Sequence, residues 1–382
     1  MATNNLSAQR IYTANSVFAN GNFIKIGVTQ EGIYKIDAAF LNASGLGATN
    51  IISTAIKLYG NGGAMLDEKN NTFYYDDLTE NAIQVIDGGD GIFNNNDYIL
   101  FYAQGPNRWL KDSTNQRFNH QKNLYSDTAY YFITVGGIGK RINTKTTTIV
   151  ANQSVTSYND RYFYENDLVN FLNSGKEWYG EEFSNINTNN LSRNFTVDLN
   201  GLIVTEPITV SSNFAGRSVL TASSLAIKAN NNLLTTLTIP ANSGNFLDVF
   251  AASISSQNSF LSAQPTLGLN YTFIPSTTTA QTWLNWFEVQ SRRALIVPTN
   301  GQLLFRDWRS VGTNNIAEFT LNNTIATTEI WDITNPFQPD KIAANFAANQ
   351  TKFINDASRL REYVAFNNSN FLTPISFGKI DN

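Results

Sequence analysis

The segment of this chain that most suggests chemistry is a glycine- and oxygen-rich run, DGGDGIFNNND, at residues 87–97. Calcium prefers six to eight oxygen ligands from carboxylates, amides and backbone carbonyls on a loop that can wrap around the ion. Such oxygens could come from Asp87, Asp90, Asn94 and Asp97. The spacing differs from that of an EF-hand, and the terminal bidentate glutamate is missing. Two interpretations stay open: a structural calcium site, or a hairpin loop whose Asp and Asn side chains bond their own backbone.

Other candidate residues favour structure over catalysis. Asp76, Asp77 and Glu80 are close neighbours that point in different directions, so we expect acidic loop solvation, or extra ligands to the adjacent ion, in place of acid–base catalysis. The single histidine, His120, lies in the polar run RFNHQKNLYSD, for which we expect a solvated or loop-bonded side chain. The chain has no cysteine, which excludes a thiolate nucleophile and sulfur-ligated metals. We therefore predict no catalytic residue, and no cofactor other than the possible structural calcium.

Composition narrows the class of protein further. The 382 residues are 42% apolar but only 15% charged, and this balance suits a β surface decorated with hydroxyl and amide groups. A net charge of −4 argues against nucleic-acid binding, which needs a clustered basic face. No run approaches the ~18 apolar residues of a membrane-spanning helix. The opening MATNNLSAQR lacks the apolar segment of a secretion signal, and we expect that a signal has been removed.

The expected elements are mostly short strands separated by Gly, Asn and Ser. In the first part we expect strands at 56–59, 82–86, 98–103, 130–135 and 146–150, a hairpin of 23–26 with 33–36 around VTQEG, and a short helix capped by Asp37 and stopped by Gly45. In the second part, RYFYENDLVNFLNSG could begin with a short helix, strands recur from Asn194 onward, and WLNWFEVQ at 283–290 is apolar on both faces, as in a central strand. This pattern predicts a mainly β fold of two antiparallel β-sandwich or jelly-roll-like domains with few short helices. We place the first domain at 1–155, with Gly- and Asp-rich loops, and the second at 156–382.

The order of several motifs resembles one known family. IKLYGNGGAML, DDLTENAIQV, DGGDGIFNNNDYILFYAQGPNRW and FNHQKNLYSDTAYYF resemble the amino-terminal region of the PorU-type sortases of the Bacteroidetes type IX secretion system. NFLNSGKEWYGEEF, EIWDITNPFQP and REYVAFN resemble later parts of the same region, so the resemblance runs from about residue 20 to the end. As an ordered set these motifs are fairly specific, although each alone would be weak.

The resemblance implies a role in protein secretion at the outer face of the bacterial outer membrane. In that family a gingipain-type cysteine peptidase domain (peptidase C25) follows this region, removes the C-terminal targeting domain of secreted cargo and attaches the cargo to the surface. The resemblance also implies an outer-membrane β-barrel partner of the PorV type. The catalytic cysteine and its histidine partner cannot be carried onto this chain, which has no cysteine. We therefore expect a non-catalytic portion that positions or gates the peptidase domain, binds the barrel partner, or recognises secreted cargo.

A carbohydrate-binding or adhesion module is the alternative from another class. Trp178, Trp283, Trp286 and Trp331 could stack on sugars, but buried tryptophans are common in sandwich strands, and only Trp178 lies in an expected loop. Loss of glycan binding on Trp178→Ala would favour this alternative. A hydrolase is the third and weakest interpretation, because no base or oxyanion donors can be identified.

Overall fold

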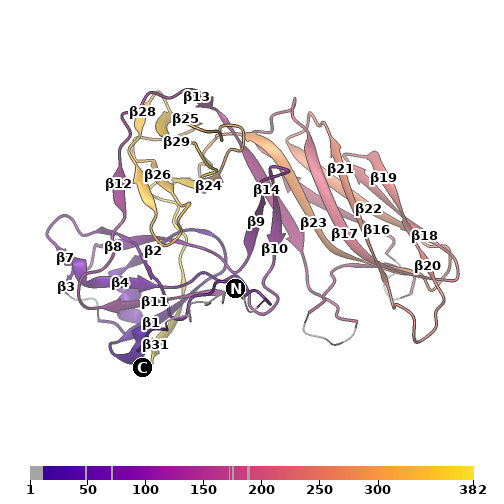
Figure 1. Cartoon of the computed structure of the whole chain (residues 1–382), viewed down its shortest axis with the longest axis horizontal. Coiled ribbons are helices and arrows are strands. Elements are labelled where there is room, and N and C mark those ends of the chain that lie inside the picture. The colour runs from indigo at the N-terminus through magenta and orange to yellow at the C-terminus, as the bar shows by residue number, and fades with distance from the viewer. Residues whose placement is uncertain (1–11, 48–49, 70–71, 172, 174–175, 187–189) are drawn as a thin grey trace, which may run out of the picture.

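The computed structural model describes residues 12–47, 50–69, 72–171, 173, 176–186 and 190–382. These residues fold into mostly antiparallel sheets with only one short α-helix and two 3₁₀ turns, so the expected mainly β class is confirmed. Figure 1 shows three lobes: a first lobe at the lower left, a third lobe above it, and a middle lobe to the right. Within the described residues, no helix is long and apolar enough to cross a membrane.

The first lobe is built from the start of the chain and its last strand. Its main sheet has the order β31 (Ile375–Ile380), β1 (Phe23–Val28), β11 (Ala129–Val135), β4 (Ile56–Tyr59) and β5 (Glu80–Asn81). Smaller sheets are formed by β2 (Gly32–Asp37), β8 (Tyr98–Ala103) and β6 (Gln84–Ile86), and by β3 (Ile51–Ile52) with β7 (Ile92–Phe93). The helices are η1 (Val17–Ala19), α1 (Ala38–Ala43) and η2 (Ser53–Ala55). Alternate side chains of the two larger sheets meet in one apolar core.

A separate two-stranded hairpin leaves the first lobe and reaches towards the middle lobe. It consists of β9 (Arg108–Asp112) and β10 (Arg117–Gln121), and Figure 1 shows it standing beside β14. The hairpin carries His120 in a strand, so the expected loop position of this residue was wrong.

The middle lobe is a two-layered sandwich. One layer contains β14 (Ser157–Glu165), β23 (Gln281–Ala294), β17 (Ile208–Val219), β20 (Ala241–Asn242), β15 (Glu182–Ser184) and β21 (Ala252–Phe260). The other has the order β16 (Ser192–Asp198), β22 (Thr266–Ile274), β18 (Ser223–Ala229) and β19 (Asn232–Ile239). β23 pairs with β14, β15 and β17, which confirms the expected central strand around Trp283. Residues from both layers form its core.

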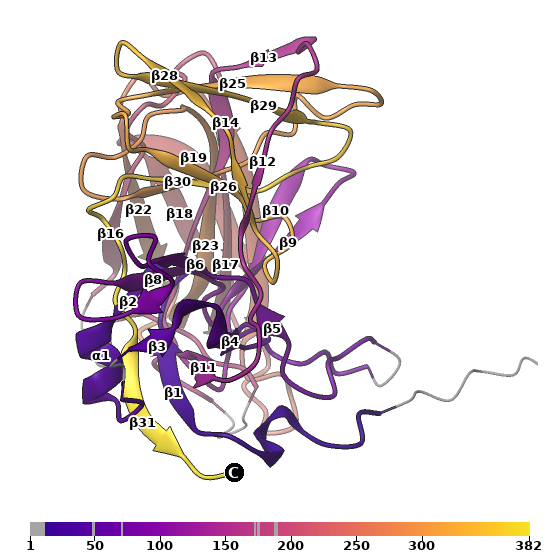
Figure 2. The same ribbon diagram turned by 90° about the vertical axis from the view of Figure 1, so that its left-hand side faces the viewer.

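The third lobe combines two short segments that precede the middle lobe with most of the chain that follows it. One sheet has the order β12 (Asn143–Lys145), β27 (Asp340–Ile342), β26 (Glu329–Asp332), β30 (Tyr363–Phe366) and β24 (Gln302–Phe305). The other has the order β13 (Gln153–Val155), β25 (Ile316–Asn322), β29 (Gln350–Asp356) and β28 (Asn345–Ala347). In the side view the first and third lobes lie one above the other (Figure 2). The expected domain boundary at residue 155 lies between β13 and β14, and the number of independent domains stays a prediction.

Three local expectations were wrong. The stretch around VTQEG is no hairpin, because β1 pairs with β11 and β31 while β2 pairs with β8. Residues 146–150 form no strand, and RYFYE belongs to β14 where a short helix was considered. The Asp37 cap is confirmed: its carboxylate accepts a hydrogen bond from the Phe40 N–H at 2.8 Å. Local capping was therefore predictable, whereas pairing between distant strands was not.

Candidate functional site

The four predicted calcium ligands lie in the loop between β6 and β8, and the loop already uses their side chains. Asp87 accepts the Gly89 N–H at 3.1 Å, and Asp90 accepts the Ile92 N–H at 2.8 Å. Asp97 accepts the N–H of Asn94 at 2.6 Å. Among the described residues, no group of three or more His, Asp or Glu side chains is arranged to hold a metal ion. The structural calcium stays a prediction, and the observed bonds support the interpretation of a self-bonded loop.

The second acidic cluster, Asp76, Asp77 and Glu80, bonds backbone N–H groups of other segments, two of them near the start of the chain. Asp76 accepts the Thr13 N–H at 2.8 Å, Asp77 accepts the Val17 N–H at 2.7 Å, and Glu80 accepts the Lys140 N–H at 2.6 Å. These carboxylates therefore bond backbone groups of distant segments. This arrangement of Asp76, Asp77 and Glu80 does not place two carboxylates on opposite sides of a substrate site.

A buried histidine cluster, which the sequence did not reveal, joins the β9–β10 hairpin to the middle lobe. His120 Nδ1 lies 2.6 Å from a Glu288 carboxylate oxygen on β23, and its Nε2 lies 2.6 Å from a Glu165 oxygen on β14. The same Glu288 oxygen accepts the His120 backbone N–H at 2.7 Å. The imidazole stacks on Phe163 with 4.4 Å between ring centroids. The His120 side chain of the hairpin is thus bonded to two strands of the middle lobe, β14 and β23.

The electrostatics of this cluster favour a charged imidazole. Burial disfavours the charge, but hydrogen bonds and charge attraction from Glu165 and Glu288 outweigh it and raise the pKa of His120. The side chain is only 4% exposed. A general base must reach the proton that it removes, and this imidazole has both nitrogens engaged and almost no access to solvent. The arrangement therefore positions two lobes.

A second buried cluster, the charged junction, lies where the three lobes meet. The Glu362 carboxylate, just before β30, accepts hydrogen bonds from Arg306 Nε at 3.0 Å and Arg161 Nη2 at 3.2 Å. It also lies 3.3 Å from Lys111 Nζ on β9. Burial opposes the negative charge, but Arg306, Arg161 and Lys111 outweigh that cost and lower the pKa of Glu362 to about 2. The junction thus links β9, β14 and the third lobe through one carboxylate.

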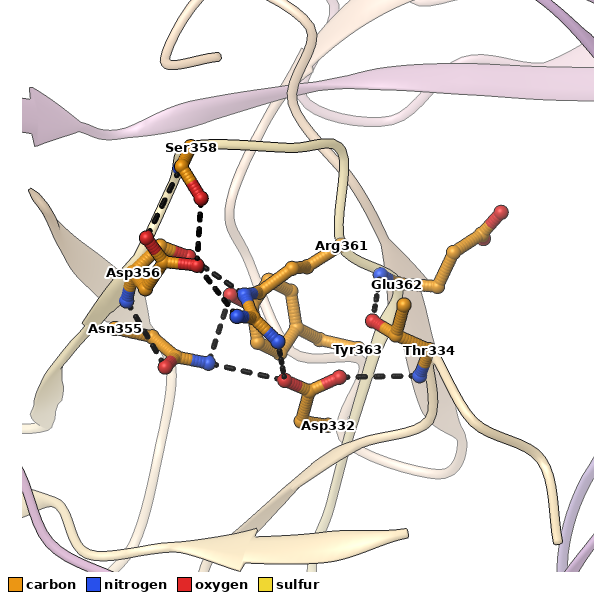
Figure 3. A network of polar contacts seen from close by, with 8 residues as sticks. All are labelled: Asp332, Thr334, Asn355, Asp356, Ser358, Arg361, Glu362 and Tyr363. Atoms are coloured by element: carbon orange, nitrogen blue, oxygen red, sulfur yellow. Dashed lines mark hydrogen bonds and ion pairs between the residues drawn. The ribbon is translucent and has the colours of Figure 1, made fainter. Parts of the chain in front are cut away.

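A polar network beside the junction holds the chain that carries Glu362 (Figure 3). Asp332 accepts hydrogen bonds from Arg361 Nη1 at 3.0 Å and Asn355 Nδ2 at 3.1 Å. Thr334 Oγ1 accepts the Glu362 backbone N–H at 3.0 Å. The network thus holds both Arg361, the residue before Glu362, and the Glu362 backbone N–H.

Two hollows border the junction. A cavity of about 150 Å³ is lined by residues that include Glu31, Tyr102, Lys111 and Arg161, and the Tyr102 hydroxyl donates to Glu31 at 2.5 Å. Next to it, an open groove of about 600 Å³ runs between the first and third lobes. The groove is lined by amides, aromatic rings and arginines, among them Asn61, Tyr75, Gln104, Asn107, Arg108, Asn335, Phe337 and Arg359.

The tryptophans considered for sugar stacking are mostly internal. Trp283 and Trp331 are buried, and Trp178 lies in a loop but is half-buried. The structure therefore brings together residues that sequence inspection did not connect: His120 with two glutamates, and Glu362 with two arginines. Polar residues inside apolar strands, such as Glu288 in WLNWFEVQ, were the available signal.

No family model matches the sequence, and no curated protein sequence matches it. Among solved structures, the fold is similar to that of dimeric latent PorU from Porphyromonas gingivalis, with a TM-score of 0.77 and 20% identity. The match covers 96% of this chain and 34% of the PorU chain, so this chain spans about a third of that protein's length. The δ-endotoxin Cry8Ea1 from Bacillus thuringiensis also matches, over 65% of this chain and 43% of its own, at a TM-score of 0.24 and 12% identity. The PorU-like fold is shown.

Proposed function

We propose that this chain is a non-catalytic part of a PorU-like type IX secretion sortase at the bacterial cell surface. The observation that carries the proposal is the PorU-like fold over nearly the whole chain, which agrees with the ordered motifs of the sequence. The chain has no cysteine, so it supplies no thiolate for a cysteine peptidase. Its role is then to hold a separate peptidase domain in place.

The charged junction and the histidine cluster support a positioning role. Three lobes that only touched through small polar surfaces would move relative to one another. Here Glu362, through Arg161 and Lys111, and His120, through Glu165 and Glu288, each join segments from different lobes by short charged contacts. Such contacts have a fixed geometry, and this makes the three lobes a defined platform for a peptidase domain and for an outer-membrane β-barrel protein of the PorV type.

Binding measurements with purified partners test the proposal. The full chain is immobilised and titrated with a PorV-type barrel in detergent, with the peptidase domain of a PorU-type sortase, and with an unrelated β-barrel as control. We expect saturable binding of at least one of the first two, with Kd at or below roughly 10 µM, and no binding of the control. Failure of both at roughly 100 µM would reject the positioning role.

Carbohydrate binding remains the second candidate function, and the groove between the first and third lobes favours it. Ligand sites are commonly hollows of about 300–1,000 Å³ with aromatic walls and a few polar groups, and this groove falls within that range. Tyr75 and Phe337 meet edge to face in it with 5.3 Å between centroids. Saccharide binding that is lost in Tyr75→Ala, with no binding of barrel or peptidase, would make this the better assignment.

A further inference from the structure

A loop at one end of the middle lobe, residues 243–250, turns its apolar side chains outward. Phe246 is 96% exposed, Leu247 87% and Val249 68%. Beside the loop, Leu220 in the turn after β17 is 78% exposed, and its backbone N–H donates to a β20 carbonyl at 2.9 Å. These four side chains form the apolar tip, next to β20 at the lower right of Figure 1. Soluble monomers rarely expose such a concentrated apolar patch unless it serves an interface.

Leu220 stands in a backbone conformation that disfavours its own side chain. Its φ is +63°, in the left-handed region, where a bulky residue is an outlier. At every other described non-glycine position with positive φ, the residue is Asn, Gln or Ala. Packing could repay the strain, but the Leu220 side chain projects into solvent and makes few contacts within the chain. A strained and exposed leucine therefore points to a contact outside the folded chain.

The backbone of the loop finds hydrogen-bond partners within the loop itself. The Asp248 carboxylate accepts the N–H groups of Ser243 at 2.9 Å and Val249 at 2.8 Å. Asn245 accepts the Leu247 N–H at 3.1 Å with its side chain and the Asp248 N–H at 3.0 Å with its carbonyl. The Ser243 hydroxyl accepts the Asn245 N–H at 3.1 Å. In lipid no water replaces a missing partner, so a loop that bonds these N–H groups internally can leave water at lower cost.

The two segments that form the apolar tip are nearly free of charge. Residues 218–224 and 239–252 contain no Lys, Arg or Glu, and their one acid is Asp248. Glu177 and Arg217 line a hollow beside the loop, and they bring one charge of each sign. Charged groups are costly to remove from water, so a tip with a single carboxylate loses little hydration when its apolar side chains are buried.

The residue types of the apolar tip favour lipid over protein as its partner. Protein interfaces are anchored mostly by Trp, Tyr and Arg, whereas Leu and Val are under-represented at such positions. Segments that insert into the surface of a membrane present Phe, Leu and Trp to the lipid. The tip offers two leucines, a valine and a phenylalanine, and no tyrosine, tryptophan or arginine. It therefore matches a membrane-inserting loop better than the centre of a protein interface.

We propose that the apolar tip inserts into the surface of a lipid bilayer. Leu220, Phe246, Leu247 and Val249 enter the boundary between headgroups and acyl chains, and the exposed Asp248 carboxylate stays at the level of the headgroups. The attraction comes from burial of apolar surface, since the tip has no basic residue to bind anionic lipids. Neutral lipids are therefore sufficient. The inference does not depend on the secretion role, because it concerns this loop and pure lipid.

Flotation of the full chain with phosphatidylcholine vesicles tests the insertion. We expect a molar partition constant on the order of 10³ M⁻¹, below that of a single myristoyl chain. Phe246→Ser/Leu247→Ser should lower it at least about 10-fold, because two large apolar side chains no longer leave water. The matched control Ile138→Ser/Val150→Ser removes similarly exposed side chains, 84% and 86%, from outside the middle lobe, and it should partition like the unmodified chain. No partition at about 10 mM lipid, or equal loss in both double variants, would overturn the proposal.

Salt and lipid charge separate insertion from electrostatic adsorption. Partition should persist when the salt concentration rises from about 0.1 M to about 0.5 M, because apolar burial is not screened by ions. Added phosphatidylglycerol should not tighten binding, since the exposed Asp248 repels anionic headgroups. Partition that requires phosphatidylglycerol and disappears in salt would overturn the proposal in favour of adsorption.

Leu220→Asn separates a membrane role from a structural one. Asn adopts the left-handed backbone more readily than Leu, so the melting temperature should stay the same or rise. The partition constant should fall at least about threefold, because one apolar side chain is lost from the tip. A lower melting temperature with unchanged partition would contradict the proposal, since it would give Leu220 a purely structural role.

Dye labelling gives a second, independent readout, because the chain has no cysteine of its own. Leu247→Cys is labelled with an environment-sensitive nitrobenzoxadiazole dye and mixed with the same vesicles. We expect its emission to shift to the blue and to be quenched by lipids that carry a nitroxide on the acyl chain. Ile138→Cys, labelled in the same way, is the control. No shift beyond this control would reject insertion, and a shift only with a purified barrel or peptidase domain would assign the apolar tip to a protein instead.

Discussion

The interior of the middle lobe and the charged junction between lobes are held together by different forces. The middle core consists of apolar side chains from both layers, with embedded hydroxyl pairs such as Ser212 and Tyr271, whose hydroxyls lie 2.8 Å apart. The junction buries a carboxylate and two guanidinium groups, with Arg306 only 2% exposed. One region excludes charge, and the other is organised around it.

The two regions show which interactions determine the relative positions of the lobes. Apolar burial is strong but has little directionality, so it holds the layers of a sandwich together without choosing one relative placement of two lobes. Charged hydrogen bonds are directional, and breaking a buried pair leaves an uncompensated charge. We infer that the core stabilises each lobe, whereas Glu362 and His120 select the arrangement of the lobes.

Replacement of Glu362 is expected to have the largest effect. Glu362→Gln leaves Arg161 and Arg306 buried beside a neutral amide, which should cost about 3–5 kcal/mol in the free energy of unfolding. Glu206→Gln is the matched control, because Glu206 pairs with Arg309 near the surface at 2.6 Å and should cost below about 1 kcal/mol. Urea denaturation compares the two. Equal losses would contradict the special role of the junction.

Acid should act on the same group. The pKa of Glu362 is depressed to about 2 in the folded protein, so its contribution is complete above the unfolded-state value and is lost as the pH falls towards 2. The unmodified chain should therefore lose stability between about pH 5 and pH 2 more steeply than Glu362→Gln. If the stability of both chains falls in parallel as the pH is lowered, groups other than Glu362 cause the sensitivity to acid.

Truncation of a core residue should be comparable or somewhat smaller, and confined to one lobe. Leu284 on β23 is fully buried in the middle core, and Leu284→Ala should cost about 2–5 kcal/mol through lost contacts and a residual cavity. Hydrogen exchange should rise in the strands of the middle lobe first, while amides of the third lobe keep their protection. Uniform loss of protection would show that the lobes unfold as one unit.

Titration of His120 should have a smaller effect on stability than titration of Glu362. The stability from His120 should be lost as the pH rises, whereas that from Glu362 is lost as the pH falls. Its pKa is raised in the folded state, so its contribution is complete below the ordinary histidine value and is lost as the pH rises through the raised value. Glu165 and Glu288 face the imidazole, and Lys122 pairs with Asp167 nearby at 2.6 Å. The melting temperature should fall from pH 6 to 9, and His120→Gln should flatten that slope. If the melting temperature of His120→Gln falls with pH as steeply as that of the unmodified chain, His120 is not the cause of the slope.

How far the sequence predicted this molecule depended on whether a feature was local. β4 and β8 begin and end where their apolar runs predicted, at 56–59 and 98–103, because strand propensity and turn residues act over a few positions. The pairing of β1 with β31 joins residues at opposite ends of the chain, and no local pattern encodes it. His120 was misplaced for the same reason, since its partner Glu288 lies 168 positions away.

The calcium loop gives the smallest expected effect and the sharpest contrast with the junction. If Asp87, Asp90 and Asp97 held calcium, chelator would lower the melting temperature and added calcium would restore it, because a ligand that binds only the folded state stabilises it. Their carboxylates already accept backbone N–H groups of the same loop, as Glu362 accepts charged partners from other lobes. A loop satisfied by its own backbone needs no ion, so we expect thermal melting with and without EDTA to coincide. A drop that calcium reverses would restore the metal site and show that the loop rearranges to bind it.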